Sequence, residues 1–494
     1  MYSLGYDIGS SSIKAALVDN NSLSTIGTAQ YPNNEMDILA VKSGWAEQDP
    51  QLWWENLILV TQKLFAQTGI DSTQIKSIGI SYQMHGLVLV NKDFEVLRPS
   101  IIWCDSRGVE IGNKAFDELG SDFCLCHLLN SPGNFTASKL KWVKENEPQV
   151  FERIHKIMLP GDFINMKLTG EINTTIGGLS EAVLWDFKNN RPSEELLSYF
   201  GFDQSIVPDL VNTIGVQGHV SKSAAQKLKL SEGIPVAYRA GDQPNNALAL
   251  NVLKPGEVAA TGGTSGVVFG VTDQYASDKK SRVNGFAHVN HAPSKPSLGI
   301  LLCINGAGIQ YGWMKGLLDS GKTSYTEIER IAASVSINAD GLKILPFGNG
   351  AERILENRDI GGRILNINFN RHKKAHLYRA ALEGIAYSFV YGCQILKEMG
   401  MKIQVMKVGN DNLFQSHVFS TTIASVLDCE IEMLSTTGAV GAAKASAVGA
   451  GLFDSLEELM QDQKIVSRYT PADNANEYKS GYEEWHSELI KLLT

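Results

Sequence analysis

The sequence has little that would direct the protein into or across a membrane. None of its apolar runs approaches the roughly 20 residues that a membrane-spanning helix requires. The N-terminus enters a strand-like pattern directly, without the basic segment and apolar stretch of a secretory signal. We therefore expect a cytoplasmic protein that has no membrane as a partner.

The sequence also lacks the cysteine spacings of zinc sites and disulfide scaffolds, and it lacks long runs of basic residues. The six cysteines include one close pair, Cys124 and Cys126, whose spacing matches neither a common zinc knuckle nor a disulfide scaffold. We expect reduced thiols. The formal net charge is -9, and without a long basic run nucleic acid is a poor partner. An anionic cofactor would have to be held by local dipoles and a few cations.

The apolar content is sufficient for large cores. The chain has 494 residues, of which 43% are hydrophobic, so we expect roughly two to four domains. Strand-like and helical segments alternate, which predicts an α/β architecture. The predicted strands are Leu4–Ile8, Ile13–Val18, Leu23–Tyr31, Ile75–Ser81, Leu87–Val90, Ile234–Tyr238 and Leu298–Ile304. Helices are predicted from Asp49-Pro50 onward, around 374–398, and in the Gly- and Ala-rich stretch 438–451, which we expect to pack closely against a neighbour.

Two strand-turn-strand segments, about 240 residues apart, resemble each other in kind. The first turn is Gly9-Ser10-Ser11-Ser12, and the second, within Val258–Val271, is Thr261-Gly262-Gly263-Thr264-Ser265-Gly266. We interpret them as a weak internal duplication that gives two related halves. Lys254-Pro255-Gly256 is a plausible boundary, so the predicted domains are residues 1–253 and 254–494.

The segment Asp7-Ile8-Gly9-Ser10-Ser11-Ser12-Ile13-Lys14 has the chemistry of a phosphate-binding turn. Gly9 lets the backbone approach a phosphate closely, and backbone N–H groups and serine hydroxyls can donate to its oxygens. Asp7 at the strand end is a candidate for holding Mg²⁺ through water, and Lys14 adds a cation. The alternative is a tight Ser/Gly hairpin with a surface lysine. The turn at 261–266 has the same two interpretations.

Asp242 is the candidate catalytic base. It follows the predicted strand Ile234–Tyr238 and precedes the helical Ala247-Leu248-Ala249-Leu250, which places it where ligands bind in α/β sheets. Phosphoryl transfer needs a carboxylate that orients the attacking hydroxyl and accepts its proton. The alternative is an Asx turn or a helix N-cap.

Met84-His85-Gly86 is a candidate sugar-binding segment, with Trp103 further along the chain. His85 can exchange a hydrogen bond with a sugar hydroxyl, and Met84 and Trp103 offer apolar faces to sugar carbons. A lone histidine is more often structural, and Asp105 with Arg107 is more often a simple ion pair.

Taken together and in order, these residues resemble the FGGY family of carbohydrate kinases, of the actin, hexokinase and Hsp70 fold superfamily. The resemblance covers about residues 3–450 and is more specific in the first half. It rests on Asp7–Lys14, Gly44-Trp45-Ala46-Glu47-Gln48-Asp49-Pro50 with Trp53-Trp54, Gln83-Met84-His85-Gly86, Ile102-Trp103-Cys104-Asp105-Ser106-Arg107, Asn305-Gly306-Ala307-Gly308-Ile309-Gln310, Gly350-Ala351-Glu352-Arg353 and Glu383-Gly384.

The resemblance implies two actin-like, ribonuclease H-like α/β domains flanking a catalytic cleft, with the sugar and the catalytic aspartate in the first domain and the nucleotide in the second. It implies ATP and Mg²⁺ as cofactors. Its segment Gln83–Gly86 is most like that of members that phosphorylate D-xylulose. The implied roles are catalysis for Asp242, sugar binding for Met84, His85 and Trp103, metal binding for Asp7, and nucleotide binding for Gly9, Ser10, Ser11, Lys14, Gly263, Thr264, Ser265, Gly306, Gln310, Gly409 and Asn410.

Three positions depart from the family pattern. The adenosine segment, usually Gly-Gly-Gly-Ala, is Val408-Gly409-Asn410-Asp411; Gln243 replaces an asparagine after the catalytic aspartate; and Ile354-Leu355 replaces Thr-Pro. A kinase for another sugar or polyol, such as ribulose, and a catalytically weak sugar-binding relative therefore remain alternatives, with an actin-like or chaperone role more remote. The sequence leaves the oligomeric state open, a homodimer included.

Overall fold

The computed structural model describes residues 1–460 and 463–494, which form two compact units. The first unit contains Met1–Asn251, Phe286–Leu298 and a segment that begins at Thr436, and the second contains Val252–Gly285, Gly299–Ser435 and a segment that begins at Gln463. The chain first passes from the first unit to the second between Asn251 and Val252, two residues before the predicted division between residues 253 and 254. The units are not continuous in sequence, however, because two later segments return to the first unit.

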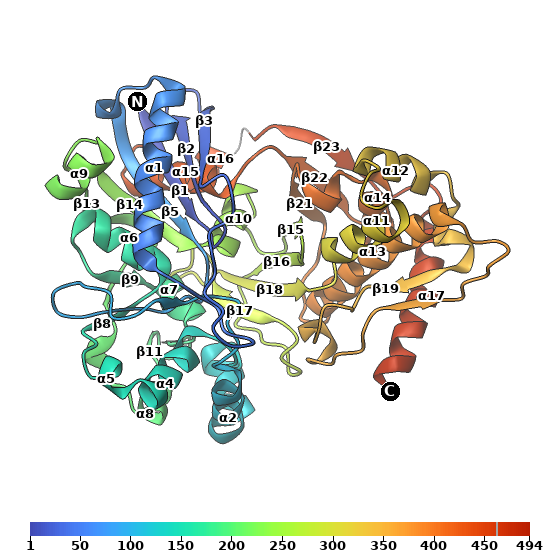
Figure 1. The fold of residues 1–494 in the computed structure, drawn as a ribbon, viewed down its shortest axis with the longest axis horizontal. Coiled ribbons are helices and arrows are strands. Elements are labelled where there is room, and N and C mark those ends of the chain that lie inside the picture. Colours follow the sequence, from blue (N-terminus) through green and yellow to red (C-terminus); the bar gives the residue numbers. More distant parts are fainter. Residues whose placement is uncertain (461–462) are drawn as a thin grey trace. The chain divides into compact units, whose positions relative to one another are not determined.

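A six-stranded mixed sheet forms the centre of the first unit, with the order β13-β14-β5-β1-β2-β3 (Figure 1). The β1 strand pairs antiparallel with β2 and parallel with β5, which is parallel to β14. The bounds are β1 (Tyr2–Ile8), β2 (Ile13–Asp19), β3 (Thr25–Tyr31), β5 (Ile75–Tyr82), β13 (Ile214–His219) and β14 (Pro235–Gly241).

The remaining elements of the first unit are helices around this sheet and short paired strands. The helices are α1 (Pro50–Thr68), α2 (Val109–Leu119), α3 (Ser121–Phe123), α4 (Thr136–Asn146), α5 (Pro148–Phe151), α6 (Pro160–Thr169), α7 (Ile176–Glu181), α8 (Glu194–Phe200), α9 (Lys222–Leu228), α10 (Asp242–Ala249), α15 (Gly438–Gly449) and α16 (Leu456–Met460). The short strands are β4 (Glu47–Gln48), β6 (Val88–Val90), β7 (Ser100–Ile101), β8 (Lys156–Met158), β9 (Asn173–Thr175), β10 (Trp185–Asp186), β11 (Arg191–Pro192) and β12 (Asp209–Val211).

A seven-stranded sheet, in the order β17-β18-β16-β15-β21-β22-β23, organises the second unit. Its strands are β15 (Val258–Gly262), β16 (Gly266–Thr272), β17 (Asn284–Ala287), β18 (Leu298–Ile304), β21 (Val405–Gly409), β22 (Glu430–Leu434) and β23 (Ile465–Tyr469), with β19 (Lys343–Leu345) and β20 (Arg363–Leu365) paired apart from it. The helices are α11 (Gly308–Asp319), α12 (Tyr325–Ala333), α13 (Lys374–Glu398), α14 (His417–Leu427) and α17 (Ala475–Leu493).

The two sheets repeat one pairing pattern, as the predicted duplication requires. In each, a hairpin strand is antiparallel to its hairpin partner and parallel to the next strand of the sheet: β1 with β2 and β5, then β15 with β16 and β21. A second parallel pair follows in both, β5 with β14 and β21 with β22. The two turns predicted to bind phosphate therefore occupy equivalent places in two related sheets.

Several local predictions are confirmed. Helix α1 begins at Pro50, and Asp49 caps it by accepting a hydrogen bond from the Gln51 amide at 2.9 Å. The long helix α13 spans the predicted 374–398. Strand ends differ from the predicted ones by up to three residues, and α10 begins at Asp242 itself, five residues before the predicted helical run at Ala247. The polar start of this helix concealed its first turn.

Helix α15 packs on β1, β2, β5 and β14 of the first unit, as Figure 1 shows for this helix among the N-terminal strands. The contact is unusually close at two glycines. A Cβ on Gly5 would lie 1.9 Å from the Ala439 carbonyl oxygen, and one on Gly79 would lie 2.0 Å from the Ala442 carbonyl oxygen. The predicted close packing of the Gly- and Ala-rich stretch is confirmed, and it explains why this late segment belongs to the first unit.

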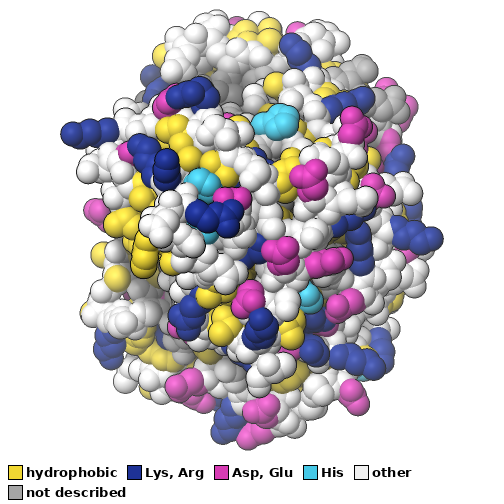
Figure 2. All heavy atoms as spheres, turned by 90° about the vertical axis from the view of Figure 1, so that its right-hand side faces the viewer, with side chains coloured by type: hydrophobic (Ala, Val, Ile, Leu, Met, Phe, Trp, Pro, Cys, Tyr) yellow, Lys and Arg dark blue, Asp and Glu magenta, His cyan; other side chains and the backbone are white. Residues whose placement is uncertain are grey.

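The surface drawn in Figure 2 carries acidic and basic side chains interspersed rather than gathered by sign. Among the described residues, no helix combines the length and apolar character needed to cross a membrane. Charge on this face does not form a broad positive field.

Candidate active site

The turn after β1 is a tight hairpin held by its own backbone. The Gly9 amide donates to the Ser12 carbonyl oxygen at 3.1 Å. Asp7, at the end of β1, accepts a hydrogen bond from the Ser81 hydroxyl at 2.9 Å and pairs across the sheet with Lys14, which is exposed. The Ser81 hydroxyl thus orients the Asp7 carboxylate at the carboxyl edge of β1.

Asp242 begins α10 at the end of β14, a strand that is separated from β1 by β5 alone. Burial raises its pKa to about 7, and the Asp7 carboxylate adds to the shift. The sequence therefore predicted correctly that Asp242 lies at a strand end before a helix, and the structure adds that Asp7 is its electrostatic neighbour. A carboxyl group with a pKa near neutrality is suited to accept and release protons.

His85 is held in a strained and well-defined position. Its φ angle is +60°, which is uncommon for a residue with a side chain. Its Nδ1 lies 2.9 Å from the Glu181 carbonyl oxygen; because a carbonyl only accepts, Nδ1 carries the proton and Nε2 is the acceptor in the neutral ring. The Phe135 and Phe286 rings lie 4.8 Å and 5.4 Å from the imidazole, centre to centre.

Met84 and Trp103 lie differently. Met84 is buried, and its side chain contacts Gly241, where a Cβ would approach the Met84 Cγ to 2.6 Å. Met84 thus lies directly beside the residue that precedes Asp242. Trp103 is 52% exposed and its Nε1 donates to the Ser10 hydroxyl at 3.3 Å, which brings it to the first turn.

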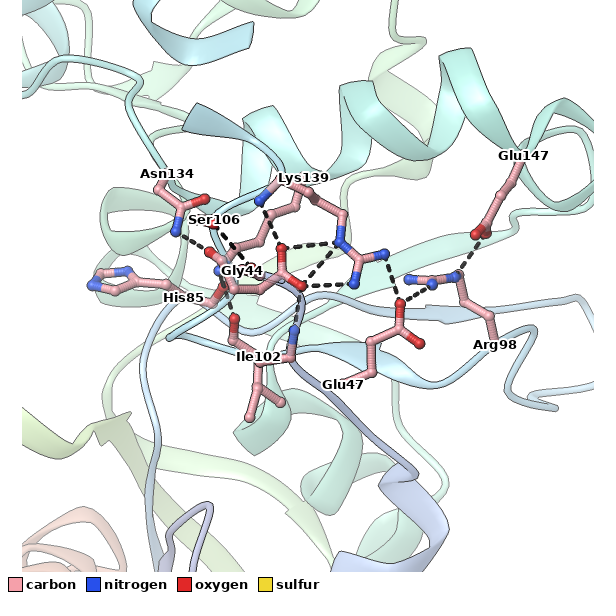
Figure 3. Close-up of polar contacts among 12 residues, drawn as sticks. Gly44, Glu47, His85, Arg98, Ile102, Ser106, Asn134, Lys139 and Glu147 are labelled. Carbon is pink, nitrogen blue, oxygen red and sulfur yellow. Dashed lines mark hydrogen bonds and ion pairs between the residues drawn. The ribbon is translucent and has the colours of Figure 1, made fainter. Parts of the chain in front are cut away.

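Asp105 and Arg107 form the predicted ion pair, within a larger buried network (Figure 3). Arg107 forms ion pairs with Asp105 and with Glu47, each at 2.6 Å. Arg98 joins Glu47 to Glu147 at 2.5 Å and 2.8 Å. The Arg107 guanidinium also lies 3.9 Å from the centre of the Trp45 ring. These charges alternate in sign, which offsets the cost of burying them.

Glu181 is a candidate that the sequence analysis missed. It is buried at the end of α7 and lines a small cavity with Met84, Gly241 and Phe286. Neither of its carboxylate oxygens makes a hydrogen bond of normal geometry. Burial raises the pKa of this group well above its usual range; the Tyr82 hydroxyl opposes the shift and the Asp242 carboxylate adds to it. A glutamate within the small and apolar stretch 177–183 was the available signal.

The second unit contains a pocket of about 540 Å³ that begins at the second predicted turn. Gly263 and Thr264 line it, and their carbonyl oxygens accept from the Gly308 and Ile309 amides at 3.0 Å each. Ser265 is exposed at the same turn. The lining residues are Gly262, Gly263, Thr264, Gly308, Ile309, Tyr311, Tyr325, Thr326, Glu329, Asn412, Leu413, Gln415 and Ser416.

Aromatic and polar groups face each other in this pocket. The Tyr311 and Tyr325 rings are stacked, with centres 5.5 Å apart. Glu329 accepts from the Ser416 hydroxyl at 2.6 Å and from the Val418 amide at 2.9 Å, which fixes the start of α14. None of the pocket's aromatic residues was singled out from the sequence, because isolated tyrosines carry no pattern.

Five predicted nucleotide residues of the second unit are not among the lining residues of this pocket: Ser265, Gly306, Gln310, Gly409 and Asn410. Gly306 and Gln310 line a neighbouring pocket of about 430 Å³. Gly409 ends β21, and the Asn410 amide donates to the Leu434 carbonyl oxygen at 2.9 Å. The 540 Å³ pocket is lined instead by residues that follow Asn410, from Asn412 to Ser416.

Glu352 supports the turn that leads into α11. It is buried and accepts from the Asn305 and Gly306 amides at 3.0 Å and 3.1 Å. Burial raises its pKa to about 7, against the effect of these two amides. A Cβ on Gly306 would lie 1.6 Å from the Pro346 carbonyl oxygen, so this turn requires glycine. The Gly350–Arg353 segment thus holds the entrance to α11.

The donors in the first unit fit Mg²⁺. Asp7 supplies carboxylate oxygens, the ligand type that Mg²⁺ prefers, and its charge lies close enough to Asp242 to raise the pKa of that group. A divalent cation would relieve that repulsion. Within residues 1–460 and 463–494, no three or more His, Cys, Asp or Glu side chains gather as a metal cage, and Mg²⁺ in kinases is typically held by few carboxylates together with substrate phosphates.

Comparisons with known proteins cover almost the whole chain. A model of the FGGY family of carbohydrate kinases, N-terminal domain, matches residues 2–249, and that of the C-terminal domain matches residues 258–450. The chain is 28% identical to the xylulose kinase of Bacillus subtilis (strain 168), over 98% of this chain and 95% of that one. It is 29% identical to the xylulose kinase of Lactococcus lactis, with the same two coverages. The crystal structure of xylulose kinase from Rhodospirillum rubrum superimposes with a TM-score of 0.89 at 26% identity, over 100% of this chain and 99% of that one.

Proposed function

Because the chain belongs to the FGGY family of carbohydrate kinases, we propose that it transfers the γ-phosphoryl group of ATP to D-xylulose, giving D-xylulose 5-phosphate. The family makes it an ATP-dependent sugar kinase. The choice of sugar is the finer step, and it is supported by the xylulose kinases to which the chain is similar. The observation that carries the proposal is Asp242, whose pKa is raised to about 7 beside Asp7 and next to the Met84–His85 segment.

In the proposed reaction, the ionised Asp242 carboxylate orients the attacking hydroxyl and accepts its proton as the oxygen–phosphorus bond forms. His85 contacts a second sugar hydroxyl through Nε2, with its ring fixed by the Glu181 carbonyl oxygen. Met84 contacts the sugar carbons from its buried position, and Trp103 lies over the exposed side. A fixed nucleophile near the base accounts for much of the rate in reactions of this kind.

We propose that the second unit binds the nucleotide in the 540 Å³ pocket. Gly263 and Thr264 face the phosphates, and the Tyr325 side of the pocket takes the adenosine. Gly9, Ser10, Ser11 and Lys14 contact the transferred phosphate. Asp7 would hold Mg²⁺, which supplies positive charge against the phosphate oxygens. Ser265, Gly306, Gln310, Gly409 and Asn410 remain predicted nucleotide contacts beside this pocket.

A panel of sugars tests the proposed substrate. The purified protein is assayed for ADP release with D-xylulose, ribulose, other ketoses and polyols, at saturating ATP and Mg²⁺. We expect kcat/KM to be highest for D-xylulose. A far higher value for another sugar would overturn the xylulose assignment and leave the kinase assignment intact. The feature that favours a kinase for another sugar or polyol is Gln243, where bacterial xylulokinases usually have asparagine.

Calorimetry with ADP and a non-hydrolysable ATP analogue tests the rival, a catalytically weak sugar-binding relative. Asn410 and Asp411 motivate it, because the family usually has small residues there. We expect saturable binding below millimolar concentrations, because the pocket is lined by Asn412–Ser416 rather than by these two side chains. Absence of binding up to millimolar concentrations would favour the rival.

The pH dependence of the reaction should report Asp242. Its pKa is raised to about 7 by burial and by Asp7, and only the ionised form accepts a proton. At low sugar concentration and saturating ATP, kcat/KM should therefore rise about tenfold per pH unit below pH 7 and level off above it. A rate that stays constant from pH 5.5 to 8 would contradict the assigned role.

Replacement of His85 should affect the sugar more than the nucleotide. In His85→Ala the KM for the sugar is expected to rise about tenfold or more, with a change of less than about twofold in the KM for ATP, since one hydrogen bond to the sugar is lost. The exposed His219 on β13 provides the matched control, His219→Ala, with both constants unchanged. A selective rise in the KM for ATP would place His85 elsewhere.

A further inference from the structure

Helix α4 (Thr136–Asn146) buries a lysine beneath the proposed sugar site. The Lys139 side chain is fully buried, which is rare for lysine unless the ammonium group is paired. Its Nζ donates to two backbone carbonyl oxygens, that of His85 at 2.9 Å and that of Ile102 at 3.0 Å. Figure 3 shows the Lys139 side chain reaching between these two segments.

Both acceptors belong to proposed sugar-binding segments. The first carbonyl is that of His85 itself, whose backbone has the uncommon φ of +60°. The second immediately precedes Trp103 in the chain. We propose that Lys139 is a positioning residue of the sugar site: its two hydrogen bonds fix the backbones of His85 and Trp103 relative to each other. This inference rests on the proposed function.

A second set of contacts joins the segment that contains Ile102 to residues 44–46 and to Asn134. Asp105 accepts from the Ala46 amide at 2.6 Å, the Ile102 amide donates to the Ala46 carbonyl oxygen at 3.1 Å, and the Ser106 amide donates to the Gly44 carbonyl oxygen at 2.7 Å. The Asn134 side-chain amide donates to the Asp105 carbonyl oxygen. Lys139 thus links segment 83–86 to segment 102–107, and these further contacts link segment 102–107 to segment 44–50; all three segments were singled out from the sequence (Figure 3).

The electrostatic surroundings of Lys139 are mixed. Burial lowers its pKa to about 7, and the Asp105 carboxylate and the Cys104 thiol oppose this shift while the Arg107 guanidinium adds to it. A hydrocarbon of similar length would fill the same space but would leave two buried carbonyl oxygens without a donor. Because the Lys139 Nζ donates to the carbonyl oxygens of His85 and Ile102, we expect it to act through the His85 and Trp103 backbones rather than by touching the sugar.

The same helix offers a matched control. Lys144 also donates to two backbone carbonyl oxygens, those of Phe200 and Gly201, which lie at the end of α8. Lys139→Met and Lys144→Met therefore each remove two hydrogen bonds from a lysine of α4 to backbone carbonyl oxygens. Only the hydrogen bonds of Lys139 involve residues of the proposed sugar site.

The test compares these variants in the full-length protein by steady-state kinetics. For Lys139→Met we expect the KM for the sugar to rise about tenfold or more, with the KM for ATP and the affinity for ADP changed less than about twofold. Lys144→Met should leave both KM values unchanged even where it lowers the melting temperature. Lys139→Gln, which keeps a neutral N–H donor group on a shorter side chain, should give an intermediate KM for the sugar and decides the question if Lys139→Met does not fold.

A purely structural role would lower thermal stability in Lys139→Met and Lys139→Gln without separating the two KM values, and that result would overturn the inference. An equal rise in the KM for ATP would overturn it as well. ADP affinity is measured by calorimetry without sugar, so it does not depend on the choice of substrate. Failure of the wild-type protein to phosphorylate any sugar would instead overturn the proposed function.

Discussion

Substitution of Asp242 by asparagine is expected to lower kcat about 10³-fold while leaving the affinity for ADP unchanged. Asparagine keeps the size of the side chain and its place at the start of α10 but cannot accept the proton of the attacking hydroxyl, a contribution typically worth 10² to 10⁴ in rate. The measurement is ADP release under saturating sugar and ATP, with ADP affinity by calorimetry. Turnover within about tenfold of the wild type would exclude Asp242 as the base.

Asp203→Asn is the matched control for this variant. Asp203 is exposed and caps a short helical turn by accepting from the Ser205 amide at 2.8 Å, a role that asparagine performs equally well. Its turnover should be that of the wild type. The Asp242→Asn protein should also be no less stable than the wild type above pH 7, because burial disfavours the charged form of Asp242 in the folded state. Any residual activity should lose its dependence on pH near 7.

Gly79→Ala is expected to destabilise the protein by about 3 kcal/mol, although it adds a single methyl group. The new Cβ would lie 2.0 Å from the Ala442 carbonyl oxygen and 2.6 Å from its carbonyl carbon, and both are backbone atoms of α15. The helix would have to move off β5, which disturbs close packing across the sheet. Urea denaturation followed by circular dichroism measures the effect, and a change below about 0.5 kcal/mol would show that α15 does not pack on β5 in this way.

Gly316→Ala is expected to raise the free energy of unfolding in the same assay, the opposite of the effect at Gly79. Gly316 lies inside α11 and a Cβ there would meet no atom within 4 Å. Alanine in an exposed helical position stabilises by roughly 0.5 to 1 kcal/mol relative to glycine. The pair separates the steric effect at Gly79 from the general consequences of replacing glycine by alanine.

The local elements that the sequence predicts well are those with strong short-range signals. Asp49-Pro50 marked the start of α1 because an N-cap and a first-turn proline act within one turn. The apolar face of residues 374–398 marked α13 because a long helix repeats its pattern many times. The start of α10 at Asp242 was harder to predict, because the helix begins with polar residues and its first turn has no apolar periodicity.

The composition of the two halves was less predictable than their number. Similar turns at residues 9–12 and 261–266 indicated two related halves, and the repeated strand pairing supports that interpretation. The assignment of α15 to the first unit did not follow from its place in the chain. It depends on how close Gly5 and Gly79 allow this helix to approach the sheet, and distances of that kind are not encoded in local patterns.

The sequence by itself indicated the family, two turns that we predict to bind phosphate and the candidate base Asp242, because these depend on residue types at fixed short spacings. Only the tertiary structure decided which distant groups surround the site residues. Burial and the Asp7 carboxylate raise the pKa of Asp242. The Glu181 carbonyl oxygen orients the His85 ring, and Lys139 donates to the carbonyl oxygens of His85 and Ile102. It also placed the 540 Å³ pocket at Asn412–Ser416 rather than at Gly409 and Asn410. Burial and long-range contacts set pKa values and side-chain orientations, and both arise only when segments far apart in the chain pack together.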